Sequence, residues 1–215
     1  RHRANVCSVS GSIKTIKNTN SPLEKQSQAM PRWANIILAL MLLPLTMIPF
    51  IIIAIGIRAT SPGPAIHWST RVGKMNILFK MPKFRTMRLD TPDVPTHLMN
   101  EPDKYVTPIG QILRLTSLDE LPQLWSILKG DMVFVGPRPA LFNQDDLIDL
   151  RTNNEVHKLA PGITGWAQIQ GRDELPIPKK VEMDVYYLKN RSFWMDSKIL
   201  FFTLFAVIKI KGVSH

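Results

Sequence analysis

Residues 33–57 read WANIILALMLLPLTMIPFIIIAIGI, and none of these 25 residues is charged. Arg32 and Arg58 lie directly on either side of the segment. Because about 20 apolar residues are enough to cross a bilayer, the sequence predicts a membrane helix here. Pro44 and Pro49 lie within it, and each removes a backbone donor and kinks a helix.

The charges on both flanks of this segment predict its topology. Residues 1–32 carry six Lys and Arg and one acid, and residues 58–89 carry seven Lys and Arg and no acid. Basic flanks stay in the cytoplasm, and a single crossing cannot keep both of them there. The sequence therefore predicts a re-entrant helix–break–helix over residues 32–58, with both ends cytoplasmic. A single kinked span with its N-terminus outside is the alternative.

The remaining chain divides around this segment. Residues 1–31 are polar and basic, and we interpret them as a flexible tail. Residues 59–215 form the predicted cytosolic, membrane-associated domain, and its fold class is α/β, mainly helical with short strands. The expected strands are residues 65–68 and 77–87, around a turn at Gly73; the expected helices are residues 109–115, 120–128, 144–159 and 181–189, and residues 161–165 form a turn. Residues 193–210 are strongly apolar and fit either an amphipathic helix in the membrane interface or a terminal core helix.

Composition limits the class of partner. The chain of 215 residues has a formal net charge of +10, which favours anionic lipids or phosphate-bearing substrates. We expect no nucleic-acid partner, because the sequence has neither zinc-finger spacing nor an RNA-binding aromatic motif. Cys7 is the single cysteine, so an intrachain disulfide is impossible. The oligomeric state stays open.

The most informative polar stretch is TSLDELPQL, residues 116–124. Pro122 is typical of a first helical turn, so Asp119 and Glu120 are predicted at the N-terminus of the helix over residues 120–128. The helix dipole there stabilises ionised carboxylates, and the free N–H groups can bind phosphate. Alternatively, Ser117 and Glu120 form a capping box, and the acids only cap the N-terminus of the helix.

Basic residues accompany this acidic pair. Arg114 lies five residues before Asp119, and Arg138 stands between two prolines in a rigid loop. Both suit phosphate binding, although the loop also fits a plain turn. Lys83 and Arg85 alternate with apolar residues, which indicates either an edge strand with a solvated face or a surface that binds lipid phosphates. Two carboxylates with arginines on both sides suit a site for phosphate and a divalent metal.

Several common motifs are missing. The sequence has no G-x-x-x-x-G-K-[ST] loop, no G-x-G-x-x-G fingerprint and no G-x-S-x-G. An Asp-x-Asp metal motif, usual in one large class of nucleotide-sugar glycosyltransferases, is also missing. These absences argue against P-loop enzymes, dinucleotide-binding enzymes and serine hydrolases.

Five motifs occur in a fixed order: KFRTM (83–87), SLDELPQ (117–123), KGDM (129–132), GPRP (136–139) and PGITG (161–165). In this combination the chain resembles the bacterial sugar transferase family, the small monotopic phosphoglycosyl transferases, from Pro31 to the C-terminus. The resemblance implies transfer of a sugar-1-phosphate from a UDP-sugar to undecaprenyl phosphate, with Mg²⁺ as cofactor and UMP as product. It places the protein at the bacterial inner membrane, with the active site on the cytoplasmic face.

The resemblance also assigns roles. Asp119 would be the nucleophile that forms a covalent phosphosugar intermediate, and Asp119 and Glu120 would hold Mg²⁺. Phosphate and substrate binding would fall to Arg114, Arg138, Lys83, Arg85 and Arg172, the last on the nucleotide side. For the sugar we expect an N-acetylated amino sugar, used in the first membrane step of surface-glycan synthesis.

One departure from the family concerns the helix break. The family usually has Ser-Pro there, and this chain has Ile48-Pro49, with Pro44 as a further proline. Two other functions remain open on sequence alone: a non-catalytic protein that binds anionic lipid, and a phosphohydrolase with an aspartyl-phosphate intermediate.

Overall fold

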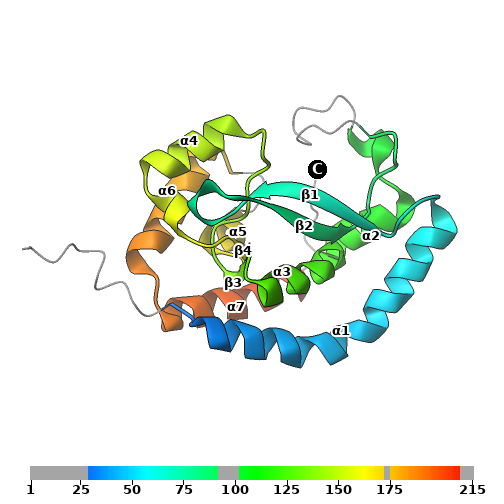
Figure 1. The fold of residues 1–215 in the computed structure, drawn as a ribbon, viewed down its shortest axis with the longest axis horizontal. Coiled ribbons are helices and arrows are strands. Elements are labelled where there is room, and N and C mark those ends of the chain that lie inside the picture. The colour runs from blue at the N-terminus through cyan, green and yellow to red at the C-terminus, as the bar shows by residue number, and fades with distance from the viewer. Residues whose placement is uncertain (1–28, 92–101, 172–174, 209–215) are drawn as a thin grey trace, which may run out of the picture.

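The structure is a computed structural model that describes residues 29–91, 102–171 and 175–208. Helices dominate these residues, and strands are few and short (Figure 1), which confirms the predicted fold class at that level. The helices are α1 (Arg32–Thr60), α2 (Pro108–Thr116), α3 (Leu124–Lys129), α4 (Asp145–Asn153), α5 (Trp166–Gly171), α6 (Ile177–Asn190) and α7 (Phe193–Ile208). The strands are β1 (Ile66–Val72), β2 (Leu78–Phe84), β3 (Val133–Val135) and β4 (Gly162–Thr164), and 3₁₀ helices cover Lys74–Asn76, Pro102–Tyr105, Leu118–Gln123 and Val156–Lys158.

β1 and β2 form the expected antiparallel hairpin. Thr70 pairs with Lys80, and the turn begins at Gly73. β1 continues to Val72, four residues beyond the predicted end of the strand, because its pairing with β2 continues that far. β2 ends at Phe84, short of the predicted residue 87.

The predicted turn at residues 161–165 is wrong. Gly162–Thr164 is strand β4, which pairs in parallel with β3. A Cβ on Gly162 would lie 2.2 Å from the backbone nitrogen of Gly136, so this close approach of two backbones requires glycine. A three-residue strand next to glycine and proline shows no alternating pattern, and the sequence therefore suggested a turn.

Helix α1 is continuous from Arg32 to Thr60 and includes Pro44 and Pro49. In Figure 1 it runs along the underside of the domain and then bends upward at one end. The hydroxyl of Thr46 donates to the carbonyl of Leu42 at 2.9 Å, and such back-bonding favours a bend between the two prolines. The re-entrant topology itself stays a prediction.

Both halves of α1 pack on the rest of the protein. Its first half joins the main core through Ala39, and its second half packs through Ile53 and Ile57 against Phe84 and Leu113. Most other side chains of α1 are exposed; Leu45, for example, is 73% exposed. Among the described residues, α1 is the helix that is long and apolar enough to cross a membrane, with a mean hydropathy of 2.8. An exposed apolar helix of this kind fits association with a membrane.

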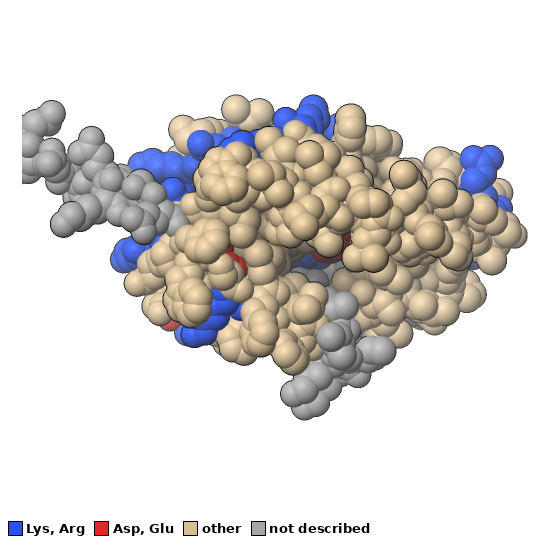
Figure 2. All heavy atoms as spheres, turned by 90° about the horizontal axis from the view of Figure 1, so that it is seen from below, with Lys and Arg blue, Asp and Glu red and all other residues tan. Residues whose placement is uncertain are grey.

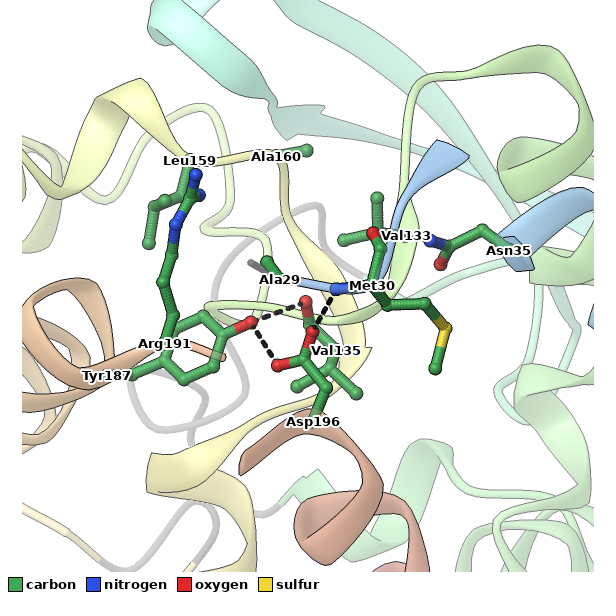
Figure 3. Close-up of a pocket in the computed structure, with 10 residues that line it drawn as sticks. All are labelled: Ala29, Met30, Asn35, Val133, Val135, Leu159, Ala160, Tyr187, Arg191 and Asp196. Atoms are coloured by element: carbon green, nitrogen blue, oxygen red, sulfur yellow. Dashed lines mark hydrogen bonds between the residues drawn. The ribbon is translucent and has the colours of Figure 1, made fainter. Parts of the chain in front are cut away.

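Polar contacts attach the beginning of α1 to the domain. Asn35 is buried, and its side-chain oxygen accepts a hydrogen bond from the backbone N–H of Phe134 at 2.8 Å. Figure 3 shows Asp196 accepting from the backbone N–H of Met30 at 2.8 Å and from the hydroxyl of Tyr187 at 2.7 Å. These groups line a cavity of about 230 Å³ beside the start of α1.

Helix α7 packs one face in the core, as the terminal core helix expected for residues 193–210 would, and leaves its other face exposed. Asp196 and Ile199 are buried in the core, whereas Trp194, Phe201 and Phe205 are exposed. The underside of the molecule in Figure 2 shows mostly uncharged side chains, with Lys and Arg mainly toward its edges. One face of α7 therefore supports the core while the other adds to the exposed apolar surface.

Candidate active site

Four segments bring their charged side chains together, and two of them, α2 and the 3₁₀ helix that follows it, are adjacent in the sequence. Lys83 comes from the end of β2, Arg114 from α2, and Arg138 from the loop after β3. Asp119 and Glu120 come from the 3₁₀ helix Leu118–Gln123, which packs against β2 and α2. The cluster thus unites two carboxylates with three of the basic residues expected to bind phosphate.

The local structure of the acidic pair differs from the prediction. Ser117 has φ 57° and ψ 17°, a left-handed conformation that ends α2, and its side chain forms no cap. Asp119 and Glu120 lie in the six-residue 3₁₀ helix that follows, and α3 begins only at Leu124. The predicted position of the acids in a first helical turn is confirmed, but that turn is 3₁₀ and not α-helical, and the alternative of a capping box is wrong. Lys83 and the neighbouring arginines compensate the charge of these carboxylates.

Lys83 and Arg138 hold Glu120 from two sides. The Lys83 ammonium donates to Oε1 of Glu120 at 3.1 Å, and Nη1 of Arg138 donates to the same oxygen at 3.0 Å. Lys83 also lies 3.8 Å from Oδ2 of Asp119. The side chains of Lys83 and Glu120 are each only 16% exposed, so solvent screens these contacts weakly. One lysine therefore bridges both carboxylates.

The two carboxyl groups differ in their affinity for protons. Burial raises the pKa of Asp119, and the neighbouring Glu120 carboxylate raises it further, against the opposing effect of Lys83, Arg138 and Arg114. Burial alone would also raise the pKa of Glu120, but Lys83 and Arg138 outweigh it and lower this pKa to about 2. Glu120 thus stays ionised, and Asp119 is the group whose charge responds to pH.

The other basic residues occupy different positions. Nε of Arg114 donates to the hydroxyl of Thr86 at 3.0 Å, which fixes its side chain within electrostatic reach of Asp119. Arg85 is buried, and its guanidinium donates to the carbonyls of Ser61 and Pro62 at 2.9 and 2.6 Å. In this structure Arg85 therefore anchors the end of α1 and does not join the cluster. Arg172, the expected nucleotide-side residue, lies outside the described residues.

Sequence reasoning missed two charged residues behind the cluster. Arg151 on α4 forms an ion pair with Asp184 on α6 at 2.7 Å, and Arg151 also donates to the backbone carbonyl of Arg138 at 2.7 Å. The two side chains are almost completely buried. Arg151 and Asp184 are 33 residues apart in the sequence. Each looks like an ordinary polar residue of a helix, so no local sequence pattern predicted the pair.

Asp119 and Glu120 also suit a divalent cation. Within the described ranges, no group of three or more His, Cys, Asp or Glu side chains could hold a metal. Mg²⁺, however, is commonly bound by one or two carboxylates together with waters and substrate phosphates. The present cations contact Oε1 of Glu120 and Oδ2 of Asp119, one oxygen of each carboxylate. The donor set therefore fits Mg²⁺ that arrives with a phosphate substrate.

Comparison with known proteins identifies the family. Residues 26–210 match the model of the family described as bacterial sugar transferase, and the chain belongs to this family. The motifs with Lys83, Asp119, Glu120 and Arg138 all lie within the matched region.

Characterised relatives share this region. The chain is 39% identical over 200 residues to the UDP-glucose:undecaprenyl-phosphate glucose-1-phosphate transferase of Escherichia coli, which covers 90% of this chain and 43% of that protein. It is 33% identical over 216 residues to the undecaprenyl-phosphate galactose phosphotransferase of Salmonella typhimurium, covering 93% and 45%. An uncharacterized sugar transferase of Bacillus subtilis, EpsL, is 38% identical, covering 86% of this chain and 91% of the relative. The chain thus spans less than half of the two characterised relatives and most of the shorter one.

Proposed function

We propose that this protein is a phosphoglycosyl transferase that moves a sugar-1-phosphate from a UDP-sugar to undecaprenyl phosphate and releases UMP. The observation that carries the proposal is the cluster itself: buried Asp119 beside Glu120, with Lys83, Arg114 and Arg138 around them. An exposed apolar helix, α1, belongs to the same fold and suits a lipid substrate. Relatives that act on UDP-glucose and undecaprenyl phosphate support both substrates.

In the proposed first step, a carboxylate oxygen of Asp119 attacks the β-phosphorus of the UDP-sugar. The new bond joins this oxygen to phosphorus, the bond from the β-phosphorus to the bridging oxygen breaks, and its electron pair leaves with UMP. In the second step an oxygen of the lipid phosphate attacks the same phosphorus and releases Asp119. Covalent catalysis thereby divides one displacement between two anions into two steps.

The neighbouring residues supply positive charge for both steps. Lys83 holds both carboxylates in place, while Arg114 and Arg138 bind phosphate oxygens and offset the repulsion between anions. Mg²⁺, held by Asp119 and Glu120, would supply further charge neutralisation at the phosphates. Glu120, whose pKa is lowered to about 2, keeps its negative charge for this purpose over the whole physiological range.

The sugar is the finer part of the proposal. We propose an N-acetylated amino sugar, and one relative, from Aeromonas hydrophila, is an N-acetylgalactosamine phosphotransferase that is 35% identical. Other relatives are named for glucose or galactose, so the donor has to be found by experiment.

The test of the reaction is UMP release by purified protein with Mg²⁺, a panel of UDP-sugars, and either undecaprenyl phosphate or no lipid. We expect multiple turnovers with one sugar in the presence of the lipid, and at most a single equivalent of UMP without it. Sustained UMP release without lipid would instead indicate a hydrolase. No UMP from any donor, in protein shown to be folded, would contradict the proposal.

For the membrane segment we propose a re-entrant helix at the bacterial inner membrane, with both ends and the active site on the cytoplasmic face. The bend of α1 in Figure 1, the two prolines within the helix and the basic flanks support this topology. Cys7, the single cysteine, precedes the segment and reports the side of its N-terminal end. In spheroplasts we expect no labelling of Cys7 by a membrane-impermeant maleimide until detergent is added. Labelling before detergent would show a single crossing.

A further inference from the structure

The loop that carries Arg138 has its backbone held at four successive carbonyl groups. Two of the donors are backbone N–H groups of neighbouring strands and two are arginine side chains. The carbonyls of Pro137, Arg138, Pro139 and Ala140 accept from Gly162 N–H at 2.9 Å, Arg151 at 2.7 Å, Arg71 at 3.3 Å and Val72 N–H at 3.0 Å. The carbonyl of Arg138 itself thus depends on one buried side chain, that of Arg151.

Arg151 is in turn fixed by Asp184. Its Nε and Nη2 donate to Oδ2 of Asp184 at 3.0 and 2.7 Å, while its Nη1 donates to the carbonyl of Arg138. A guanidinium can serve two acceptors on two edges at once because it is planar and has five donors. The pair therefore links α6 through α4 to the loop, and Figure 1 shows these two helices side by side.

Stability alone explains such a pair poorly. The side chains of Arg151 and Asp184 are only 11% and 3% exposed, so both charges have lost most of their hydration. Replacing a buried ion pair by apolar side chains of similar size is often neutral or stabilising. Their geometric effect on Arg138 distinguishes them from apolar residues that would fill the same space.

Arg138 needs this support because its own side chain is half-exposed. The Arg138 side chain is 39% exposed and its guanidinium contacts Glu120 at 3.0 Å, and ion pairs open to water hold geometry weakly. We propose that Arg151 and Asp184 are positioning residues that fix the backbone of Arg138 and thereby direct its guanidinium to Glu120 and to the phosphate of the substrate. The contact of Arg138 with the substrate phosphate rests on the proposed function. The fixing of the Arg138 backbone by Arg151 and Asp184 does not.

A double-mutant cycle tests the catalytic part. The paired substitution R151M/D184L, made alone and together with R138A, is assayed by UMP release with the donor and the lipid. We expect R151M/D184L to lower kcat/KM about tenfold when it is the only change. When R138A is already present, we expect R151M/D184L to lower kcat/KM by less than about twofold more, because the effects of coupled residues are not additive. R151K should lose activity similarly, because its donors are on one nitrogen and cannot replace the three guanidinium nitrogens that reach Asp184 and the Arg138 carbonyl. Equal losses in both backgrounds would overturn the proposal.

The control for the double-mutant cycle is an ion pair on α6, the helix that carries Asp184. Lys179 and Glu182 form an exposed ion pair on α6 at 2.8 Å, and K179M/E182Q should change neither kcat nor KM. The melting temperature of R151M/D184L should stay within a few degrees of that of the unaltered protein. If R151M/D184L fails to fold, R151K carries the cycle.

Hydrogen–deuterium exchange tests the loop without any turnover. The amides of Gly162 and Val72 donate to carbonyls of this loop, so R151M/D184L should accelerate their exchange at least several-fold, while R138A should leave them protected. Unchanged exchange in R151M/D184L would overturn the proposal whether or not the protein is a transferase. Absence of turnover by the unaltered protein would contradict the proposed function and leave this measurement to decide the role of the pair.

Discussion

Replacing Asp119 by asparagine is expected to abolish sugar-phosphate transfer and leave the fold intact. The amide keeps the shape of the side chain but cannot attack phosphorus, and loss of a covalent nucleophile reduces kcat by roughly 10⁴-fold or more. UMP release with donor and lipid measures the loss. Intact-mass measurement with donor alone should detect a phosphosugar adduct in the unaltered protein and none in D119N.

Stability separates this effect from misfolding. Burial raises the pKa of Asp119, so the folded state binds a proton more tightly than the unfolded state and loses stability as pH rises past the ordinary aspartate range. At pH 8 the neutral amide avoids that loss, and D119N should melt at the same temperature or higher. The matched control is D149N, on the exposed face of α4, which should retain full activity. Substantial turnover by D119N would show that Asp119 is not the nucleophile.

Replacing Lys83 by methionine should produce the second largest effect, a fall in kcat of roughly 10²-fold at pH 7, the scale seen when one charge-stabilising donor is removed. Lys83 lies 3.1 Å from Glu120 and 3.8 Å from Asp119. Among the neighbouring cations it lowers the pKa of both carboxyl groups most, against the opposing effect of burial. Without it the pKa of Asp119 rises further, and less of the nucleophile is ionised at neutral pH.

The pH dependence of kcat tests this explanation. Because only ionised Asp119 attacks, activity should rise with pH on the acid side of the profile, and in K83M this rise should move to higher pH. The deficit relative to the unaltered protein should therefore shrink as the pH is raised. Lys80 provides the control, since it lies on the same strand and donates to Thr70 at 2.7 Å on an exposed surface. A K83M profile that is lower but not displaced would show that Lys83 acts on substrate binding alone.

Local patterns in the sequence predicted much of the fold. The uncharged run over residues 33–57 predicted the helix that leaves most of its side chains exposed, and the alternation around Gly73 predicted the hairpin. Helices α2 and α6 begin and end within a few residues of their predicted bounds. These elements could be predicted from the sequence because hydrophobic periodicity and turn residues are properties of a few neighbouring positions.

The sequence predicted only part of the candidate site. Ordered motifs predicted Asp119, Glu120, Lys83 and Arg138, and the spacing of five residues before Asp119 predicted Arg114. The structure brings these five residues together. The motifs gave no warning that the acids lie in a 3₁₀ helix after a left-handed Ser117, since serine rarely adopts that conformation. Nor could they show that Arg85, two residues from Lys83, turns away to bind the carbonyls at the end of α1.

The sequence by itself therefore determined the long apolar helix, the positions of α2 and α6, the hairpin and the identity of the charged residues, because charge, apolar runs and turn residues are properties of neighbouring positions. Only the tertiary structure decided which charges meet. The ion pair of Arg151 with Asp184, the β3–β4 pairing and the two cations on Glu120 join residues separated by 18 to 37 positions. Contacts of that range leave no periodic signal, since they depend on how the core orients each element.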